Sequence, residues 1–308
     1  MSRSIFAAAA ATTLLCLSNP ACAGAEAAQA TQTEPGRFTV EVIGAGPDVI
    51  LIPGLSTPRD VWRPTAEALK GQYRVHLVQI RGFGDDPGAN VSGPVLAPFV
   101  DELADYAARL KHPAVIGHSL GGLAAMQLAE RHPGVAGKVM VVDAVPFIAT
   151  LFNPDATIDT ARVQAGRMRD MMLARAAASQ GKPRPAPRDC SAVTGTSPPA
   201  TGAMSLDAKG MCQIGNWMLQ ASSQVVAQAM FDDMTSDERQ GIASIAVPLT
   251  VLYAVDARDP RHLGTAGTFA AAYAGAPKAR LVPIADSAHF VMLDQFDKCL
   301  DAIRTFLR

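Results

Sequence analysis

The chain has 308 residues, of which 49% are hydrophobic and 18% charged, and its formal net charge is −1. This is the balance of a globular protein with enough apolar material for one sizeable core. The absence of a basic surplus or of a lysine and arginine run argues against nucleic acid or anionic lipid as a partner.

Residues 1–23 have the pattern of a secretory signal peptide. One positive charge in "MSRS" precedes the apolar run "IFAAAAATTLLCLS", and small residues follow in an A-x-A pattern that ends at Ala23. The apolar run is too short to span a bilayer. We therefore expect cleavage after Ala23, with Ala30 as a later alternative, and a linker over residues 24–36. The mature protein is expected to be exported, periplasmic or secreted, without a membrane span.

From about residue 37 the chain alternates strand-like and helix-like stretches. Residues 37–44 alternate apolar and polar residues, as a half-exposed strand does. Six short, β-branched and apolar runs fit strands buried on both faces; they occupy residues 48–54, 74–82, 113–119, 138–144, 249–255 and 279–286. Amphipathic stretches such as residues 57–71 and 95–111 lie between them and predict covering helices. The order predicts the α/β class: a mostly parallel central sheet with helices on both faces.

One block breaks this alternation. Residues 147–240 are rich in methionine and contain no convincing strand. We expect them to form an inserted helical cap over one end of the sheet, between the two parts of the main domain, residues 37–146 and 241–308.

Three cysteines remain after the predicted cleavage. Cys190 and Cys212 are close in sequence and lie in the expected cap, so in an oxidising compartment they predict a disulfide. Cys299 lies in an apolar C-terminal helix and is then a buried free thiol. The alternative is three buried, unpaired thiols.

The stretch "VIGHSLGGLA", residues 115–124, places a serine where a strand turns into a helix. Gly117 and Gly121 keep the neighbouring positions small, as the tight turn requires. Such a turn exposes the Oγ of Ser119 and directs the N–H of Leu120, at the start of the helix, toward a developing oxyanion. The G-x-S-x-G pattern in this setting predicts a nucleophile elbow.

A serine nucleophile needs a base, and a base needs an orienting acid. His289 follows the last predicted strand, at the end of the sheet where parallel folds place reactive groups, and is the predicted base. The other histidines occupy positions that require no function; they are His76, His112, His118, His132 and His262.

The acid is expected from a loop at the same end of the sheet. Asp256 follows the strand at residues 249–255 most closely and is the first choice. Asp143 ends another predicted strand and Asp259 precedes a proline, so both stay open as alternatives.

The order Ser…Asp…His and the motif G-H-S-L-G-G resemble the α/β-hydrolase superfamily of esterases, lipases and their relatives. The resemblance covers the chain from about residue 37 to its end, interrupted by the cap. "LIPGLSTPRDVW" is similar to the family's oxyanion loop, which implies that the backbone N–H of Leu55 is the second oxyanion donor. This chain has Pro53 where the family usually has a histidine, so the loop must be supported differently. The family often has a glycine in the acid loop, where this chain has "YAVD".

The expected activity is hydrolysis of a carboxylic ester through an acyl-enzyme. Cleavage of an amide or peptide by the same triad is an alternative, and so is a binding protein on an inactive scaffold. No metal or dinucleotide motif is present, so no cofactor and no metal are expected. The substrate is expected to be a small, apolar ester, because cap residues Met168, Met172, Trp217 and Phe231 are expected to lie above Ser119.

Overall fold

The computed structural model describes residues 36–308 except 180, 182–184, 199, 201–202 and 260–264. The predicted signal peptide and nearly all of the predicted linker lie outside the described residues, and so does His262.

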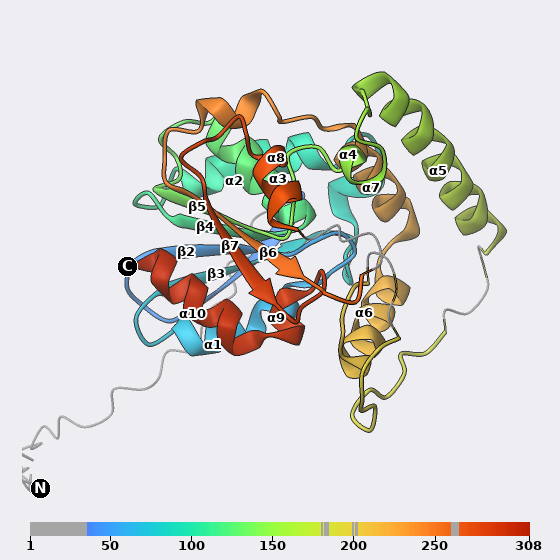
Figure 1. Ribbon diagram of the computed structural model, residues 1–308. Helices are drawn as coiled ribbons and strands as arrows, with labels where there is room; N and C mark the ends of the chain where they lie inside the picture. Colours follow the sequence, from blue (N-terminus) through green and yellow to red (C-terminus); the bar gives the residue numbers. More distant parts are fainter. Residues whose placement is uncertain (1–35, 180, 182–184, 199, 201–202, 260–264) are drawn as a thin grey trace, which may run out of the picture.

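Seven strands form one sheet in the order β1-β3-β2-β4-β5-β6-β7 (Figure 1). β1 runs antiparallel to β3, and every other neighbouring pair is parallel. The strands are β1 (Phe38–Ile43), β2 (Asp48–Ile52), β3 (Arg74–Ile80), β4 (Ala114–His118), β5 (Lys138–Val142), β6 (Leu249–Val255) and β7 (Arg280–Ala285). Each of the seven predicted stretches contains one of them, so the predicted fold class is confirmed.

Helices cover both faces of the sheet. One face packs on α2 (Leu96–Ala107), α3 (Leu120–Arg131) and α8 (Ala266–Ala272). The other face packs on η1 (Arg59–Trp62), α1 (Arg63–Leu69), α9 (Val291–Asp294) and α10 (Phe296–Leu307). In α2 the buried Leu96, Phe99, Val100 and Leu103 recur at the helical spacing that places them on one side. The central strand β4 is buried at all five positions, as a strand between two helical layers must be.

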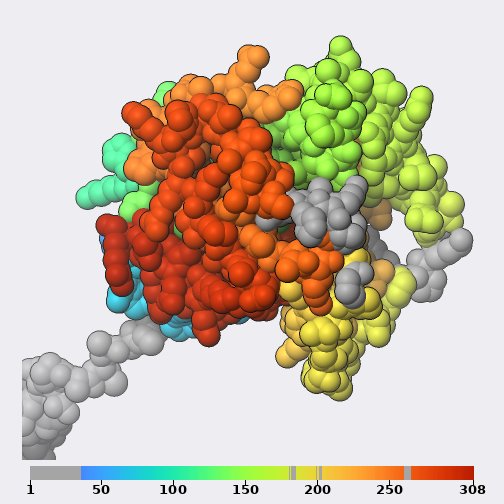
Figure 2. Space-filling model, in the orientation of Figure 1, coloured from blue at the N-terminus to red at the C-terminus, as the bar shows by residue number. Residues whose placement is uncertain are grey.

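The described part of the segment between β5 and β6 is mostly helical. It contains α4 (Ala149–Phe152), α5 (Ile158–Ala178), α6 (Ala208–Gln220) and α7 (Ser223–Thr235), and η3 (Gly241–Ser244) follows. In its described residues the β-structure is limited to one isolated bridge, between Thr196 and Asp207. Figure 2 shows this segment, in green and yellow, beside the orange and red C-terminal part of the chain.

The cysteines are arranged as predicted. Cys190 and Cys212 form a disulfide that joins the loop after α5 to α6. Cys299 is a buried free thiol in α10, and burial raises its pKa to about 12, so it is a poor nucleophile. In the described part of the chain, no helix combines the length and the apolar character needed to cross a membrane.

Candidate active site

Ser119 occupies a strained turn between β4 and α3. Its backbone angles are φ 53° and ψ −124°, a conformation that side-chain-bearing residues rarely adopt. Three backbone hydrogen bonds hold the turn: the Ser119 N–H donates to the carbonyl of Val142 over 2.9 Å, and the N–H groups of Gly122 and Leu123 donate to the carbonyl of Ser119 over 2.7 and 3.0 Å. The predicted strand–turn–helix geometry around the serine is therefore present.

The two glycines of the turn are required by close backbone contacts. A Cβ on Gly117 would lie 2.0 Å from the carbonyl oxygen of Gly121. A Cβ on Gly121 would lie 2.6 Å from the carbonyl oxygens of Ile52 and Pro53 in the neighbouring strand end and loop. Backbone atoms cannot give way as a flexible side chain can, so the small size expected at both positions has a direct steric cause.

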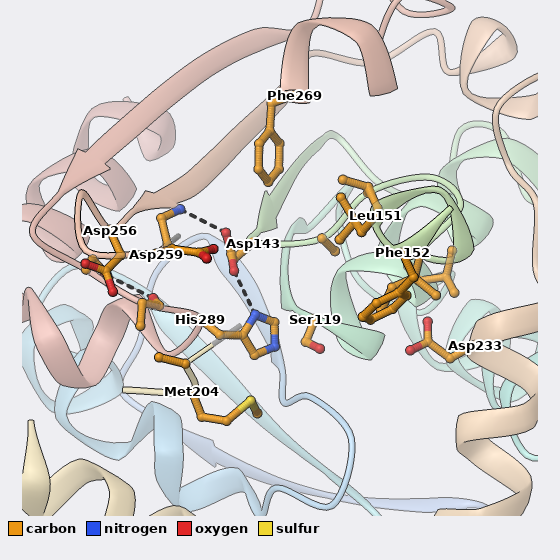
Figure 3. A pocket seen from close by; sticks show the side chains of 18 residues that line it. Ser119, Asp143, Leu151, Phe152, Met204, Asp233, Asp256, Asp259, Phe269 and His289 are labelled. Atoms are coloured by element: carbon orange, nitrogen blue, oxygen red, sulfur yellow. Dashed lines mark hydrogen bonds and ion pairs between the residues drawn. The ribbon is translucent and has the colours of Figure 1, made fainter. Parts of the chain in front are cut away.

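His289 lies in the loop after β7 and pairs with Asp143. Its Nδ1 is 2.7 Å from Oδ2 of Asp143, and Oδ1 of the same carboxyl accepts a hydrogen bond of 2.8 Å from the N–H of Ala254. Figure 3 shows the imidazole between Asp143 and Ser119. A carboxylate that accepts the Nδ1 proton leaves the lone pair on Nε2, the nitrogen available to the serine.

The first-choice acid of the sequence, Asp256, does not contact the imidazole. Its Oδ1 accepts from the N–H and the Nε of Arg258 over 2.9 and 3.2 Å, and Figure 3 shows it to one side of His289. Asp259 lines the same pocket, and its N–H donates to the carbonyl of Asp256. The preference for Asp256 is therefore corrected: the carboxyl that holds His289 is that of Asp143.

Strand order explains the correction. β5 lies directly beside β4, and His118 and Val142 are paired in the parallel ladder, so Ser119 and Asp143 emerge next to each other. β6 is one strand farther from the serine. Asp143 also has φ 49°, in the left-handed region that aspartate tolerates better than most residues.

The two expected oxyanion donors flank Ser119. Leu120 is the first residue of α3, so its N–H is one of those that a helix leaves without an intrahelical acceptor. The loop after β2 touches the serine from the other side, since a Cβ on Gly54 would lie 3.0 Å from Cβ of Ser119. Among the described residues, no group accepts a hydrogen bond from the N–H of Leu55. Both donors can therefore serve a bound oxygen.

His118 supports the loop that carries His289, which the sequence did not indicate. Its Nε2 donates to the carbonyl oxygen of His289 over 2.9 Å, and the two rings lie 4.6 Å apart between centroids. Burial, together with the nearby His289, lowers the pKa of His118 well below its ordinary value, so this second imidazole stays neutral. It fixes the backbone of His289 without adding a charge.

The loop that carries His289 is also tied to the inserted segment. The N–H of His289 donates to the carbonyl of Ala203, and the carboxyl of Asp294 accepts from the N–H of Ala288 over 2.8 Å. The same Asp294 carboxyl accepts from the hydroxyl of Ser205 over 2.5 Å and from the N–H of Leu206 over 3.0 Å. The position of the imidazole thus depends on contacts with residues of the segment predicted to be the cap.

A pocket of about 320 Å³ opens above Ser119, a size typical of small-molecule sites. Strand ends and the inserted segment both line it; the lining residues from the segment include Ile148, Leu151, Phe152, Ala203, Met204 and Asp233. The aromatic and methionine lining was expected, but from other residues. The four expected positions, Met168, Met172, Trp217 and Phe231, are not among the residues that line the pocket. Trp217 packs on Phe290, and Phe231 lies under the guanidinium of Arg169.

Asp233, on α7, is the second feature that the sequence did not reveal. It lines the pocket and is 9% exposed, and burial raises its pKa to about 7. Figure 3 shows its carboxyl on the far side of Ser119 from His289. Within the described residues, no group of three histidine, cysteine, aspartate or glutamate side chains is arranged to hold a metal ion.

Comparison with known proteins gives one family. The model described as "Alpha/beta hydrolase family" matches residues 49–302, which is most of the chain. Among solved structures, a thermophilic esterase from Thermogutta terrifontis, with malate bound, superposes with a TM-score of 0.63 at 20% identity, over 91% of this chain and 97% of that one. At this identity the likeness shows the fold alone.

Two curated relatives carry the same name, pimeloyl-[acyl-carrier protein] methyl ester esterase. The protein from Aeromonas hydrophila subsp. hydrophila is 38% identical over 108 residues, which are 35% of this chain and 42% of the relative. The protein from Xanthomonas campestris pv. campestris (strain B100) is 28% identical over 281 residues, which are 87% of this chain and 98% of the relative. The match to the Aeromonas protein, which has the higher identity, thus covers less than half of that protein's length.

Proposed function

The chain belongs to the alpha/beta hydrolase family, and we propose that it is a serine hydrolase that cleaves carboxylic esters with Ser119, His289 and Asp143 as its triad. The observation that carries the proposal is the 2.7 Å contact between Asp143 and Nδ1 of His289, with the imidazole facing a serine on a strained turn. The names of the curated relatives support an ester as the substrate class.

The proposed reaction begins with proton transfer. Nε2 of His289 takes the proton of Ser119 as Oγ attacks the ester carbonyl, and Asp143 stabilises the imidazolium that forms. The negative charge that develops on the carbonyl oxygen is received by the N–H groups of Leu120 and Leu55. His289 then returns the proton to the leaving alcohol, and an acyl group remains on Ser119.

Deacylation repeats these steps with water. His289 removes a proton from the water molecule that attacks the acyl-enzyme, and the second tetrahedral intermediate uses the same two N–H groups. The free acid then leaves, and Ser119 regains its proton. The substrate is proposed to be small, since the pocket measures about 320 Å³, and partly apolar, since Leu151, Phe152 and Met204 line it.

The test is turnover of a panel of 4-nitrophenyl esters and matching anilides by the purified protein. We expect the esters to be cleaved, and Ser119→Ala to lower kcat by at least about three orders of magnitude. Ser191→Ala, at an exposed serine, is the control and should retain full activity. Equal activity of Ser119→Ala and wild type would refute the proposal, and cleavage of the anilides alone would replace the ester with an amide.

We also propose that the protein is exported after removal of residues 1–23. The signal-like pattern of these residues supports the proposal, and the Cys190–Cys212 disulfide suits an oxidising compartment. Fractionation of the producing cells with N-terminal sequencing tests it. A mature protein in the periplasm or medium that starts at Gly24 is expected, and an uncleaved cytoplasmic protein would contradict export.

A further inference from the structure

Asp233 is a buried carboxyl to which the described residues supply no hydrogen-bond or ion-pair partner. It is 9% exposed, and within the described residues its side chain makes no hydrogen bond or ion pair. The adjacent Asp232 is the opposite case, because its Oδ2 accepts from the N–H groups of Val95 and Leu96, and its Oδ1 from Gln228. The two neighbouring aspartates on α7 therefore differ: the carboxyl of Asp232 binds the start of α2, whereas that of Asp233 faces the pocket.

Burial of a carboxyl without a partner is costly, so such groups are almost always paired. Burial raises the pKa of Asp233 to about 7, so the carboxyl stays neutral over a wider pH range, and the neutral form costs less to bury. Its side chain lines the pocket, where a bound molecule can reach it. A partner that arrives with the ligand would complete its interactions.

The charge of the pocket indicates which kind of partner fits. The carboxyls of Asp143, Asp256 and Asp259 line the same cavity, and none of its described lining residues is a lysine or an arginine. Asp143 is paired with His289 and Asp256 with Arg258. Asp233 therefore provides a carboxyl that needs a cation, in a cavity whose other walls are mostly apolar.

The position of Asp233 also indicates which end of the substrate it meets. His289 must give its proton to the leaving alcohol, so the alcohol lies on the imidazole side of Ser119. Asp233 lies on the opposite side (Figure 3). The acyl chain of the proposed acyl-enzyme therefore extends toward Asp233.

We propose that Asp233 is a specificity-determining residue that binds a cationic ammonium group carried by the acyl chain of the substrate. The inference rests on the proposed ester hydrolysis at Ser119. It names a substrate class, esters of amino or quaternary ammonium acids, and it disfavours acids that carry a second negative charge.

Matched esters of nearly equal shape test this proposal. The 4-nitrophenyl ester of 4-(trimethylammonio)butanoic acid is compared with that of 5,5-dimethylhexanoic acid, in which carbon replaces the charged nitrogen, together with shorter and longer homologues of both. We expect wild type to prefer the cationic member of at least one pair by about 10- to 100-fold in kcat/KM, the range of a hydrogen-bonded or ionic contact with a buried charge.

Asp233→Asn keeps the shape and removes the charge, so it should abolish this preference: kcat/KM for the cationic ester should fall to the value for the neutral ester. Asp170→Asn removes the same charge from an exposed site on α5 and should keep the preference. Unchanged preference in Asp233→Asn, or no preference in wild type for any pair, would overturn the proposal.

A binding measurement separates this proposal from the proposed function. Calorimetry with Ser119→Ala should show binding of the intact cationic ester, and the added Asp233→Asn change should weaken it about 10-fold or more. If wild type cleaves neither ester but this difference in binding is found, ester hydrolysis fails and the cation site stands. If both esters are cleaved but the two binding constants are equal, the cation site fails alone.

Discussion

Asp143→Asn is expected to remove most of the activity without loosening the fold. The carboxyl of Asp143 has two fixed neighbours, the Nδ1 of His289 at 2.7 Å and the N–H of Ala254 at 2.8 Å. An asparagine keeps its oxygen on the N–H of Ala254, because its amide nitrogen cannot accept that bond. The amide NH₂ group then faces His289.

This orientation selects the wrong tautomer of the imidazole. An NH₂ donor opposite Nδ1 favours a lone pair on Nδ1 and a proton on Nε2, which faces Ser119 and cannot act as a base. Restoring the active tautomer would bring two N–H donors face to face, and each unsatisfied donor costs about 1–3 kcal/mol. With the lost stabilisation of the imidazolium, the barrier rises by about 4–5 kcal/mol, which lowers kcat about 10³- to 10⁴-fold.

The assay is kcat for a 4-nitrophenyl ester, with thermal unfolding as the check on folding. Asp256→Asn is the matched comparison: its carboxyl bonds to Arg258 and does not touch the imidazole, so kcat should change less than about tenfold. If Asp256→Asn lost as much activity as is expected of Asp143→Asn, and Asp143→Asn remained active, the assignment of the acid would be refuted.

Three further variants follow from the same contacts. Burial raises the pKa of Asp233 and favours its neutral form, so the contribution of this group to stability should fall as the pH rises from about 4 to about 7; Asp232 and His289 are the nearby charged groups. Asp233→Asn should therefore be up to about 4 kcal/mol more stable than wild type at pH 8 and less so at pH 5, as measured by denaturant unfolding, and equal gains at both pH values would exclude this cause. Gly121→Ala forces a Cβ against two carbonyl oxygens and should cost about 1–3 kcal/mol together with most of the activity, whereas Gly215→Ala, with open space around it, should cost nothing in the same assays. Asp294→Asn should lower kcat/KM about tenfold and speed hydrogen exchange in residues 203–206, and unchanged exchange would show that this carboxyl does not hold the loop.

The sequence predicted the parts of the site that depend on local pattern. The apolar run before Ser119, the glycines around it and the helical pattern after it lie within one short segment, so the elbow could be inferred from that segment alone. His289 was inferred in the same way, since it directly follows a strand in a parallel sheet. These inferences needed no knowledge of which strands are neighbours.

The acid could not be inferred in this way, because the choice depends on strand order. Asp143 and Asp256 both follow buried strands, and their loops reach the same end of the sheet. The pairing of β4 with β5 brings Asp143 beside Ser119. That pairing joins two separate segments of the sequence, so no local motif indicates it. Proximity to a strand end was therefore an insufficient criterion.

The pocket walls were harder still to predict. Helical periodicity showed that the inserted segment has apolar faces. However, α5 and α7 pack on each other, and residues such as Phe231 lie in this contact and not in the pocket wall. The lining comes instead from the short helix α4, which carries Phe152, and from the irregular stretch that carries Met204. The sequence carries one weak signal for Asp233, the acidic pair in "FDDM" on the helix α7. This pair indicates a pocket residue only once the position of α7 relative to Ser119 is known.

Covalent trapping of the nucleophile tests the central claim most directly. The purified protein is treated with a serine-reactive phosphonate ester, digested and analysed by tandem mass spectrometry. We expect one phosphonyl adduct, on Ser119, formed much more slowly in His289→Ala and absent from Ser119→Ala. An adduct on another residue, or undiminished labelling of Ser119→Ala, would contradict the assignment of Ser119 as the nucleophile.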